Sequence, residues 1–326
     1  MFVKFSRRVK FLLIFIYFLS LTSTAQAATT YYVNDTNGSD DNNDNGTEST
    51  PFKTITKALT KADDDDTIIV SSGTYQENTL TIGKSFTLKS SGAVTLDGDN
   101  AHSVIKITGV TPTIEGFTIK NGKNDSMGGG ILVDNSYTLT VKNCRFESNA
   151  ADMGGAINHN GNGSRSLIIE NCTFVSNTAT GNSGGAVDSH AGTMKITNCT
   201  FTNNKLSGND PKGDGVYLAT GTNTINYCTF VNNTATTGGA IYKDTGYGGT
   251  VTVENSIIHG SVSGVTPEAT SCITLTSAQT TESAQDKDKK VTHTVFRKYS
   301  ELSAAVNKGN DDTVTVDQLK QCNRQA

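Results

Sequence analysis

One short phrase recurs six times between residues 114 and 258, and its spacing limits the chain to a stacked architecture. The steps between copies are 27, 28, 27, 29 and 28 residues, measured along Phe117, Cys144, Cys172, Cys199, Cys228 and Ser256. Units of this length recur at a fixed period when each one buries its apolar face only against its neighbours. The sequence therefore predicts a solenoid.

Each repeating unit reads as two strands joined by a bend. Apolar residues such as Leu139 and Val141 alternate with polar ones, which is the period of a strand with one buried face. The bend column consists of Gly116, Asn143, Asn171, Asn198, Tyr227 and Asn255. Gly and Asn adopt left-handed backbone most cheaply, so this column predicts a left-handed bend. Tyr227 is the exception, and a bend shifted by one residue to Asn226 is the alternative there.

A glycine-rich landmark follows each bend and precedes another apolar strand. Its copies begin at Gly128, Gly154, Gly184, Gly213 and Gly238. Small residues allow a tight turn and close backbone approach at these points. Each repeat then holds three short strands, which make one coil of a parallel β-helix. We therefore expect an all-β fold whose coils are spaced by about 4.8 Å.

The tetrapeptides Gly-Gly-Ala-Ile and Phe-x-x-Asn resemble the repeat of the polymorphic outer membrane proteins. The second tetrapeptide stands at 146–149, 174–177, 201–204 and 230–233. This resemblance covers about 117–260 and implies a right-handed parallel β-helix displayed at the cell surface, often in adhesion. Residues 31–96 are similar to the opening of many pectate-lyase-like β-helices. Lyases, hydrolases and non-enzymes share that opening, so it leaves the activity open.

The first 27 residues read as an export signal, with basic residues before an apolar stretch and Ala25-Gln26-Ala27 as the cleavage site. No other stretch is long and apolar enough to span a bilayer. The whole chain has 27 Lys+Arg and 31 Asp+Glu. Removal of the four basic residues of the signal leaves 23 Lys+Arg, so the net charge of the mature chain is near −8. Nucleic acid is a poor partner for that balance. We expect an exported protein, extracellular or on the outer-membrane surface of a bacterium.

The expected organisation places the β-helix over 28–262, a polar linker over 263–292 and a short C-terminal segment over 293–326. Ile55, Ala58 and Leu59 recur at helical spacing and predict a short helix that caps the first coil. The C-terminal segment echoes this helix-and-strand opening. Two interpretations of it stay open, a cap for the last coil and the truncated start of a second β-helix.

Four of the six cysteines share one column of the repeat, whereas Cys272 and Cys322 lie outside it. Side chains in register project in parallel, which fits disulfide geometry poorly. A straight ladder also does not converge on one point, as zinc ligands must. We therefore expect the four repeat cysteines to be buried, reduced thiols that act as small apolar fillers.

The candidate ligand-binding residues occupy equivalent positions of successive repeats, in the strand that follows the glycine-rich landmark. Asp188, His190, Tyr217 and Tyr242 form one patch across several coils if these columns face outward. Sugar rings suit such a patch, because their C–H faces stack on aromatic rings while their hydroxyls form hydrogen bonds. An ordinary solvated sheet with scattered Tyr and Asp is the alternative.

A second candidate site lies near the N-terminus. Asp41, Asn43 and Asn45 alternate ahead of Gly46, as oxygen ligands do in the first half of a calcium loop. Phe52 stands where the acidic ligand at the twelfth position belongs. The two interpretations are a structural calcium site and an Asx-rich surface turn.

Neither of two polysaccharide-cleaving chemistries finds its full set of residues. A hydrolase needs two or three carboxylates close together, and Asp188 and Asp214 lack a third. A calcium-dependent lyase needs a carboxylate cluster beside a basic residue, and Lys195 and Lys243 have none in their repeats. We therefore expect an adhesin-like binding or structural protein for polysaccharides or cell surfaces. A polysaccharide lyase or glycoside hydrolase is the alternative.

Overall fold

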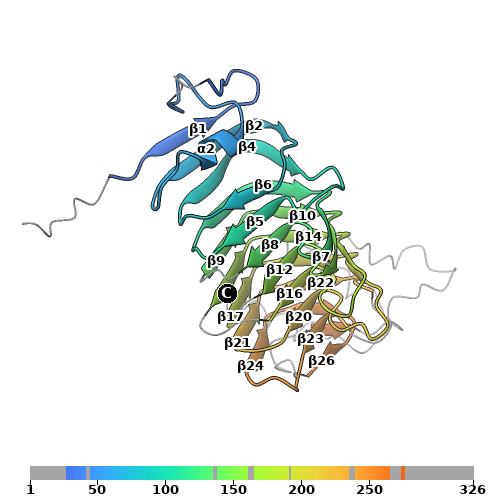
Figure 1. Ribbon diagram of the computed structural model, residues 1–326. Coiled ribbons are helices and arrows are strands. Elements are labelled where there is room, and N and C mark those ends of the chain that lie inside the picture. The colour runs from blue at the N-terminus through green and yellow to red at the C-terminus, as the bar shows by residue number, and fades with distance from the viewer. Residues whose placement is uncertain are drawn as a thin grey trace, which may run out of the picture.

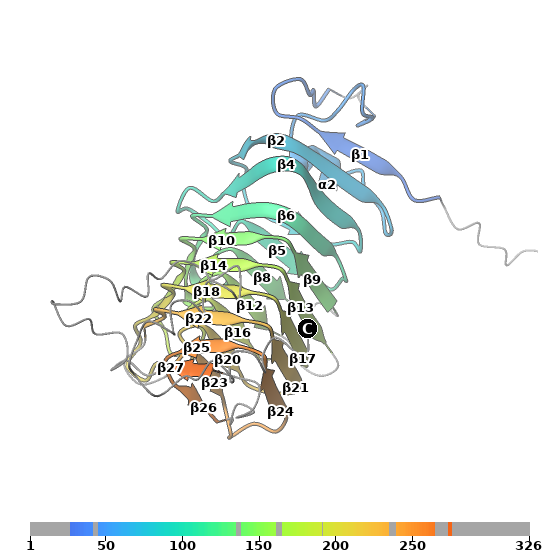
Figure 2. The ribbon, with the colours of Figure 1, turned by 180° about the vertical axis from the view of Figure 1, so that it is seen from behind.

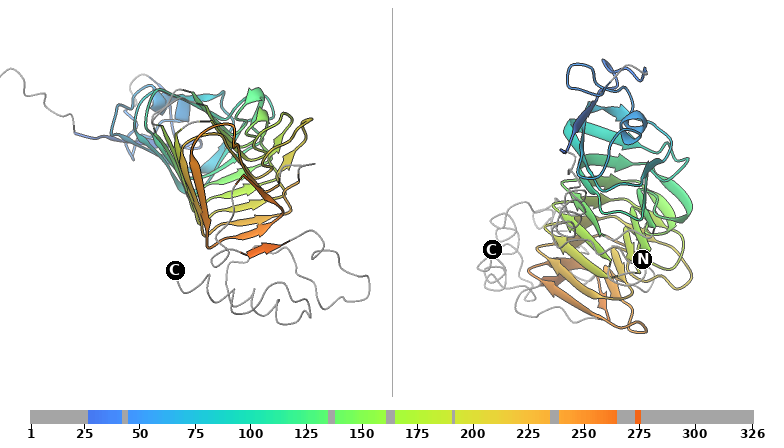
Figure 3. Two further views of the ribbon diagram at one scale, coloured as in Figure 1. Left: turned by 90° about the horizontal axis from the view of Figure 1, so that it is seen from below. Right: turned by 60° about the vertical axis from the view of Figure 1, so that its left-hand side comes forward.

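The computed structural model describes residues 27–41, 45–134, 138–160, 165–190, 192–234, 239–264 and 273–275. Over these residues the chain winds into a parallel β-helix whose coils stack from the N-terminal to the C-terminal end (Figure 1). The view along the stack shows the strands surrounding a common interior (Figure 3). This confirms the predicted all-β solenoid.

Three parallel sheets form the walls of the solenoid. The 15-stranded sheet, seen from behind in Figure 2, contains β1 (Thr30–Val33), β2 (Thr67–Tyr75), β4 (Thr87–Asp97), β6 (Thr113–Lys120), β9 (Thr138–Lys142), β10 (Arg145–Glu147), β13 (Ser166–Glu170), β14 (Thr173–Val175), β17 (Thr193–Thr197), β18 (Thr200–Thr202), β21 (Thr222–Asn226), β22 (Thr229–Val231), β24 (Thr250–Glu254), β25 (Ile257–His259) and β27 (Ile273–Leu275). The 8-stranded sheet contains β3 (Leu80–Ile82), β5 (Ile105–Thr108), β8 (Ile131–Asp134), β12 (Ile157–Asn160), β16 (Val187–Ser189), β20 (Val216–Leu218), β23 (Ile241–Lys243) and β26 (Val262–Ser263). The 4-stranded sheet contains β7 (Lys123–Met127), β11 (Ala150–Met153), β15 (Thr178–Ala179) and β19 (Lys205–Leu206).

The bends adopt the left-handed backbone that the sequence predicts. Asn143 and Asn171 have φ values of 54° and 56°. Tyr227 has a φ of 55°, so the bend stays at this residue and the alternative at Asn226 is wrong. The register of the coils holds it there, because the Tyr227 N–H donates to the Glu254 carbonyl of the next coil at 3.3 Å.

Identical residues stack through the interior from coil to coil. Phenylalanine rings stack with centroid separations of 4.9, 4.5 and 4.6 Å in the order Phe146, Phe174, Phe201 and Phe230. All four rings are fully buried. Burying one such side chain contributes roughly 1.5–3 kcal/mol to the free energy of folding, so this column is a major part of the core.

The cysteine column is buried beside these rings, and its four thiols are free. The backbone N–H of Cys144 donates to Sγ of Cys172 at 3.4 Å, and that of Cys172 donates likewise to Cys199. At the end of the column, Ser256 Oγ accepts from the Cys228 N–H at 3.0 Å. The prediction of buried, unbridged thiols in this column is confirmed.

The asparagine of each Phe-x-x-Asn tetrapeptide points into the coil and joins a hydrogen-bond ladder. Asn177 Nδ2 donates to the Phe146 carbonyl at 3.1 Å and to Asn204 Oδ1 at 2.9 Å. Its Oδ1 accepts from the backbone and side-chain N–H groups of Asn149 at 3.1 and 3.0 Å. Buried polar groups need such partners, which gives the recurring Asn a structural role.

The short helix α2 (Ile55–Leu59) covers the first coil, as the sequence predicts. The Thr54 side chain caps it by accepting from the Lys57 N–H at 3.1 Å. The Glu77 carboxylate accepts from the Ile55 N–H at 2.7 Å. These contacts satisfy helix N–H groups that have no partner within a helix this short.

The solenoid extends beyond the boundary expected at residue 262. Strand β27 pairs in parallel with β25, with Ile273 opposite Ile257, so part of the expected linker over 263–292 continues the stack. The predicted export signal over 1–27, apart from its last residue, and the segment over 293–326 lie outside the described residues. Among the described residues, no helix is long and apolar enough to cross a membrane.

Candidate functional site

The outer face of the 8-stranded sheet carries one column of side chains in register from coil to coil. From its N-terminal end, this outer column reads Thr81, Lys106, Leu132, Asn158, Asp188, Tyr217, Tyr242 and Ser263. Parallel pairing keeps neighbouring members about 4.8 Å apart. Of these members, Lys106, Leu132 and Tyr242 are partly exposed and can contact a ligand that lies along the stack, whereas Asn158, Asp188 and Tyr217 are buried.

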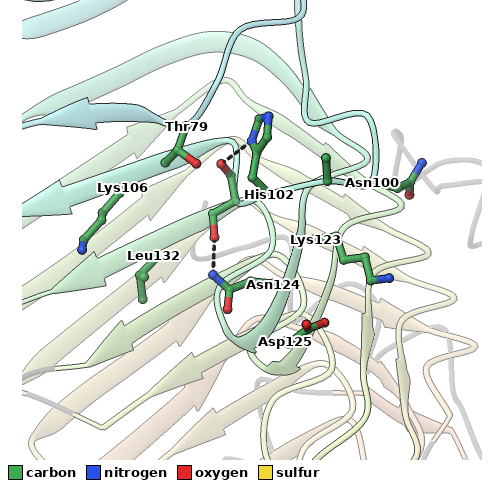
Figure 4. Close-up of a pocket in the computed structure, with 10 residues that line it drawn as sticks. Thr79, Asn100, His102, Lys106, Lys123, Asn124, Asp125 and Leu132 are labelled. Carbon is green, nitrogen blue, oxygen red and sulfur yellow. Dashed lines mark hydrogen bonds between the residues drawn. The ribbon is translucent and has the colours of Figure 1, made fainter.

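A cavity of about 450 Å³ opens at the N-terminal end of this face. Lys106 and Leu132 line one side of it, whereas Lys123, Asn124 and Asp125 of β7 line the other (Figure 4). A second cavity of about 200 Å³ shares Asn124 and Leu132 with the first. We call the two together the trough. The volume of the larger cavity falls within the range of small-ligand sites, roughly 300–1,000 Å³.

Hydrogen bonds hold the β7 wall of the trough in place. Asn124 Nδ2 donates to Ser103 Oγ at 2.8 Å, and Asn124 Oδ1 accepts from the N–H groups of Ser126 and Met127 at 2.8 and 3.1 Å. His102 Nδ1 lies 3.0 Å from the Ser103 carbonyl oxygen (Figure 4). The wall is thus fixed by the protein itself, so the trough is preformed.

The structure brings the four predicted patch residues together further along the same face. The rings of Tyr217 and Tyr242 stack with centroids 5.8 Å apart, and the His190 ring lies 5.3 Å from that of Tyr217. Asp188 Oδ1 lies 3.0 Å from His190 Nε2. The Tyr217 hydroxyl donates to Asp244 Oδ2 at 2.8 Å, which adds a carboxylate to the patch.

The patch is less exposed than the sequence predicts. Asp188 is 0% exposed and Tyr217 is 4% exposed. Ser183, from the segment that leads into β16, donates to Asp188 Oδ2 at 2.9 Å. The alternation of residues in β16 predicts that the Asp188 side chain points away from the interior of the coil. It does not predict that the segment with Ser183 covers this side chain. A ligand above the patch would therefore contact His190 and Tyr242, and Asp188 only through its neighbours.

Contacts within the patch change its titration behaviour. The contact with the Asp188 carboxylate raises the pKa of the His190 imidazole, against the effect of its partial burial. The hydrogen bond from Tyr217 lowers the pKa of Asp244. Burial, helped by that bond, raises the pKa of the Tyr217 hydroxyl. The patch is therefore a connected polar cluster and not a row of independent surface groups.

The other residues considered for chain cleavage have structural surroundings. Asp214 is buried, which raises its pKa to about 6, and its carboxylate accepts from the Gly215 N–H at 3.1 Å. Lys243 is also buried, and its Nζ donates to the Ala219 carbonyl at 2.9 Å. Lys195 belongs to β17 of the 15-stranded sheet. Within the described part of the chain, these residues form neither cleavage arrangement.

The predicted calcium loop is only partly described. Asp41 and Asn45 are exposed, and Asn43 lies outside the described residues. The carboxylate of Asp40 anchors this segment by accepting from the Thr54 hydroxyl at 2.7 Å. The calcium interpretation of the loop stays a prediction.

The sequence does not predict the trough. Lys106 and Leu132 alternate with buried residues in their strands, so their outward direction is readable from the sequence. The opposite wall is β7, whose sequence Lys-Asn-Asp-Ser-Met has no alternation of apolar and polar residues. The position of β7 opposite β5 depends on how the chain passes from one sheet to the next. No pattern of neighbouring residues in the sequence indicates that path.

Two family models match the chain. The model "Right handed beta helix region" matches residues 108–280, and "Protein of unknown function (DUF1565)" matches residues 36–110. No curated protein matches the sequence.

Several solved structures are similar at low identity. Pectin methylesterase PemA from Erwinia chrysanthemi is 14% identical with a TM-score of 0.41, over 81% of this chain and 97% of that chain. Pectate lyase Pel9A is 16% identical with a TM-score of 0.35, over 77% and 80%. A pectin methylesterase from Aspergillus niger is 17% identical with a TM-score of 0.30, over 78% and 84%. Values this low support no inference about activity.

Proposed function

Because the chain belongs to the right-handed β-helix family, we propose that it binds carbohydrate chains along the outer face of its 8-stranded sheet. The trough carries this proposal, since it is preformed and lies at one end of the outer column. The predicted patch around His190 and Tyr242 lies on the same face, further along the stack. A chain of sugar units bound in the trough could extend toward it.

The lining of the trough suits a carbohydrate better than an apolar molecule. Asn100, Ser103 and Asn124 bring amide and hydroxyl groups, and Lys106 and Lys123 bring ammonium groups. Sugar hydroxyls accept and donate hydrogen bonds to such groups, while the C–H faces of the rings need only small apolar surfaces. One leucine and one alanine supply that apolar surface.

Binding measurements with a panel of oligosaccharides test the proposal. Lys106→Ala and Lys123→Ala each remove a donor from the trough and should weaken binding roughly tenfold, which corresponds to about 1.4 kcal/mol. Lys195→Ala removes an exposed lysine from β17, on another sheet, and should leave the affinity unchanged. Equal losses in all three variants, or no binding by the wild type, would contradict the proposal.

Cleavage is the competing outcome of the same experiment. Release of reducing ends or unsaturated products from a bound polysaccharide would replace the binding role with that of a hydrolase or lyase. Stable recovery of the intact oligosaccharide after incubation with the protein supports binding alone.

We further propose an adhesin-like role at the bacterial cell surface or in the medium, related to that of polymorphic outer membrane proteins. The paired tetrapeptides and the export signal support this. Fractionation of the native bacterium is the corresponding test. Recovery in the outer-membrane or extracellular fraction is expected, and recovery in the cytoplasm alone would refute it.

A further inference from the structure

The connection between β19 and β20 contains the one Asp–Pro bond of the chain. The sequence has four prolines, and only Pro211 follows an aspartate. The connection leaves the 4-stranded sheet after Leu206 and enters the 8-stranded sheet at Val216. The Asp210 side chain is 70% exposed, whereas Pro211 is buried. The carboxylate next to this peptide bond is therefore in contact with water.

Asn182, in the preceding coil, holds the main chain on both sides of this bond. The Asp210 N–H donates to Asn182 Oδ1 at 3.0 Å, and the Lys212 N–H donates to the Asn182 carbonyl at 2.9 Å. Lys212 Nζ lies 3.1 Å from Asp210 Oδ2. This ion pair leaves Asp210 Oδ1 without a partner among the described residues. The main chain is thus fixed on both sides of the bond, and one carboxylate oxygen stays free to react.

We propose that the chain cleaves itself at the Asp210–Pro211 bond in mild acid. The Asp210 carboxylate attacks the carbonyl carbon of its own residue, and the new C–O bond closes a five-membered ring. The C–N bond to Pro211 then breaks, and its electron pair takes a proton from solvent, so Pro211 leaves as a secondary amine. Water hydrolyses the resulting cyclic anhydride, which leaves Asp210 as a C-terminal residue with two carboxyl groups. The sum of these steps is the hydrolysis of one peptide bond by one water molecule.

Proline and the fixed main chain both favour this reaction. The Pro211 nitrogen belongs to a tertiary amide, and acid protonates such a nitrogen more readily than that of an ordinary peptide bond. The other titratable groups near the ion pair are Asp244 and Tyr242, which act on the Lys212 ammonium. Holding nucleophile and carbonyl together before the reaction lowers its entropic cost. The folded chain should therefore react faster than an unstructured peptide of the same sequence.

Both fragments should stay together in the solenoid after cleavage. Strand pairs on either side of the cut, β16 with β20, β17 with β21 and β18 with β22, hold the two parts in one stack. The new chain ends lie beside the predicted patch, because Lys212 Nζ is 5.7 Å from the centroid of the Tyr242 ring. This inference does not depend on carbohydrate binding.

Incubation of the mature protein at about pH 4.5, where circular dichroism must show an intact β-helix, tests the proposal. Gel electrophoresis under denaturing conditions and mass spectrometry should show two fragments, one ending at Asp210 and the other beginning with Pro211. Asp210→Asn removes the nucleophile and should slow the cleavage roughly tenfold or more. Asp64→Asn removes an exposed aspartate that precedes another aspartate, and should leave the rate unchanged.

A synthetic peptide with the sequence of residues 207–214 separates the effect of the structure from that of the sequence. We expect the folded chain to be cleaved roughly tenfold faster than the peptide, because Asn182 and Lys212 hold the reacting groups. Asn182→Ala should remove most of this difference. A folded chain that reacts no faster than the peptide, or that yields no fragment ending at Asp210, would overturn the proposal. The comparison with the peptide decides the question even if a variant does not fold.

Discussion

Tyr227 occupies a backbone conformation that suits the asparagines of the other coils. Its φ of 55° is left-handed, which costs a residue with a bulky side chain about 1–2 kcal/mol. Tyr227→Asn should therefore raise the free energy of unfolding by up to about 1 kcal/mol, measured by urea denaturation. The matched reversal, Asn198→Tyr, should lower it by a similar amount. A loss of stability in both variants would show that the Tyr227 side chain outweighs the backbone cost.

His159 makes the stability of the fold depend on pH. Burial, with a smaller effect of Arg165, lowers its pKa to about 4 from the ordinary 6.5. Between pH 6.5 and 4, His159 is protonated in the unfolded chain but neutral in the folded protein. The contribution of neutral His159 to stability is therefore complete above pH 6.5 and is lost as the pH falls toward 4. Between pH 7 and 4.5, His159→Leu should lose about 2 kcal/mol less stability than the wild type. Identical pH dependence of urea unfolding in the two proteins would disprove this.

At the scale of structural elements, the cysteine column should be unreactive in the folded protein. All four thiols are buried, so a reagent in solution cannot reach them while the protein is folded. In a Cys272→Ser, Cys322→Ser background, a thiol reagent should label no cysteine until denaturant is added and four afterwards. Labelling of any repeat cysteine at the rate of an exposed thiol would contradict the buried column.

The repeating strands and the helix that caps the first coil were predictable from the sequence, whereas the segments that cover the outer face of the 8-stranded sheet were not. The step from Cys144 to Cys172 fixes which strands pair, and the alternation in β9 or β13 fixes which side chains enter the core. The burial of Asp188 depends on a contact with Ser183, which has no periodic signal. The trough depends likewise on β7, a polar strand at the edge of its sheet. Register follows from periodicity, but the path of a connecting segment follows from packing.

At the scale of the whole molecule, stacking turns positions far apart in the chain into one continuous face. Lys106 and Tyr242 belong to the same outer column, although several coils separate them. Each coil contributes one side chain to this column, so binding strength and specificity can change by single substitutions that leave the core intact. The helix α2 covers the first coil and prevents edge-to-edge pairing at that end.

Hydrogen exchange with and without a bound oligosaccharide tests most directly whether this face is the binding surface. We expect slower exchange of backbone amides in β5, β7 and β8, around the trough, and unchanged exchange in β13, β17 and β21 of the 15-stranded sheet. Protection confined to the 15-stranded sheet, or no change in β7 at saturating oligosaccharide, would contradict it.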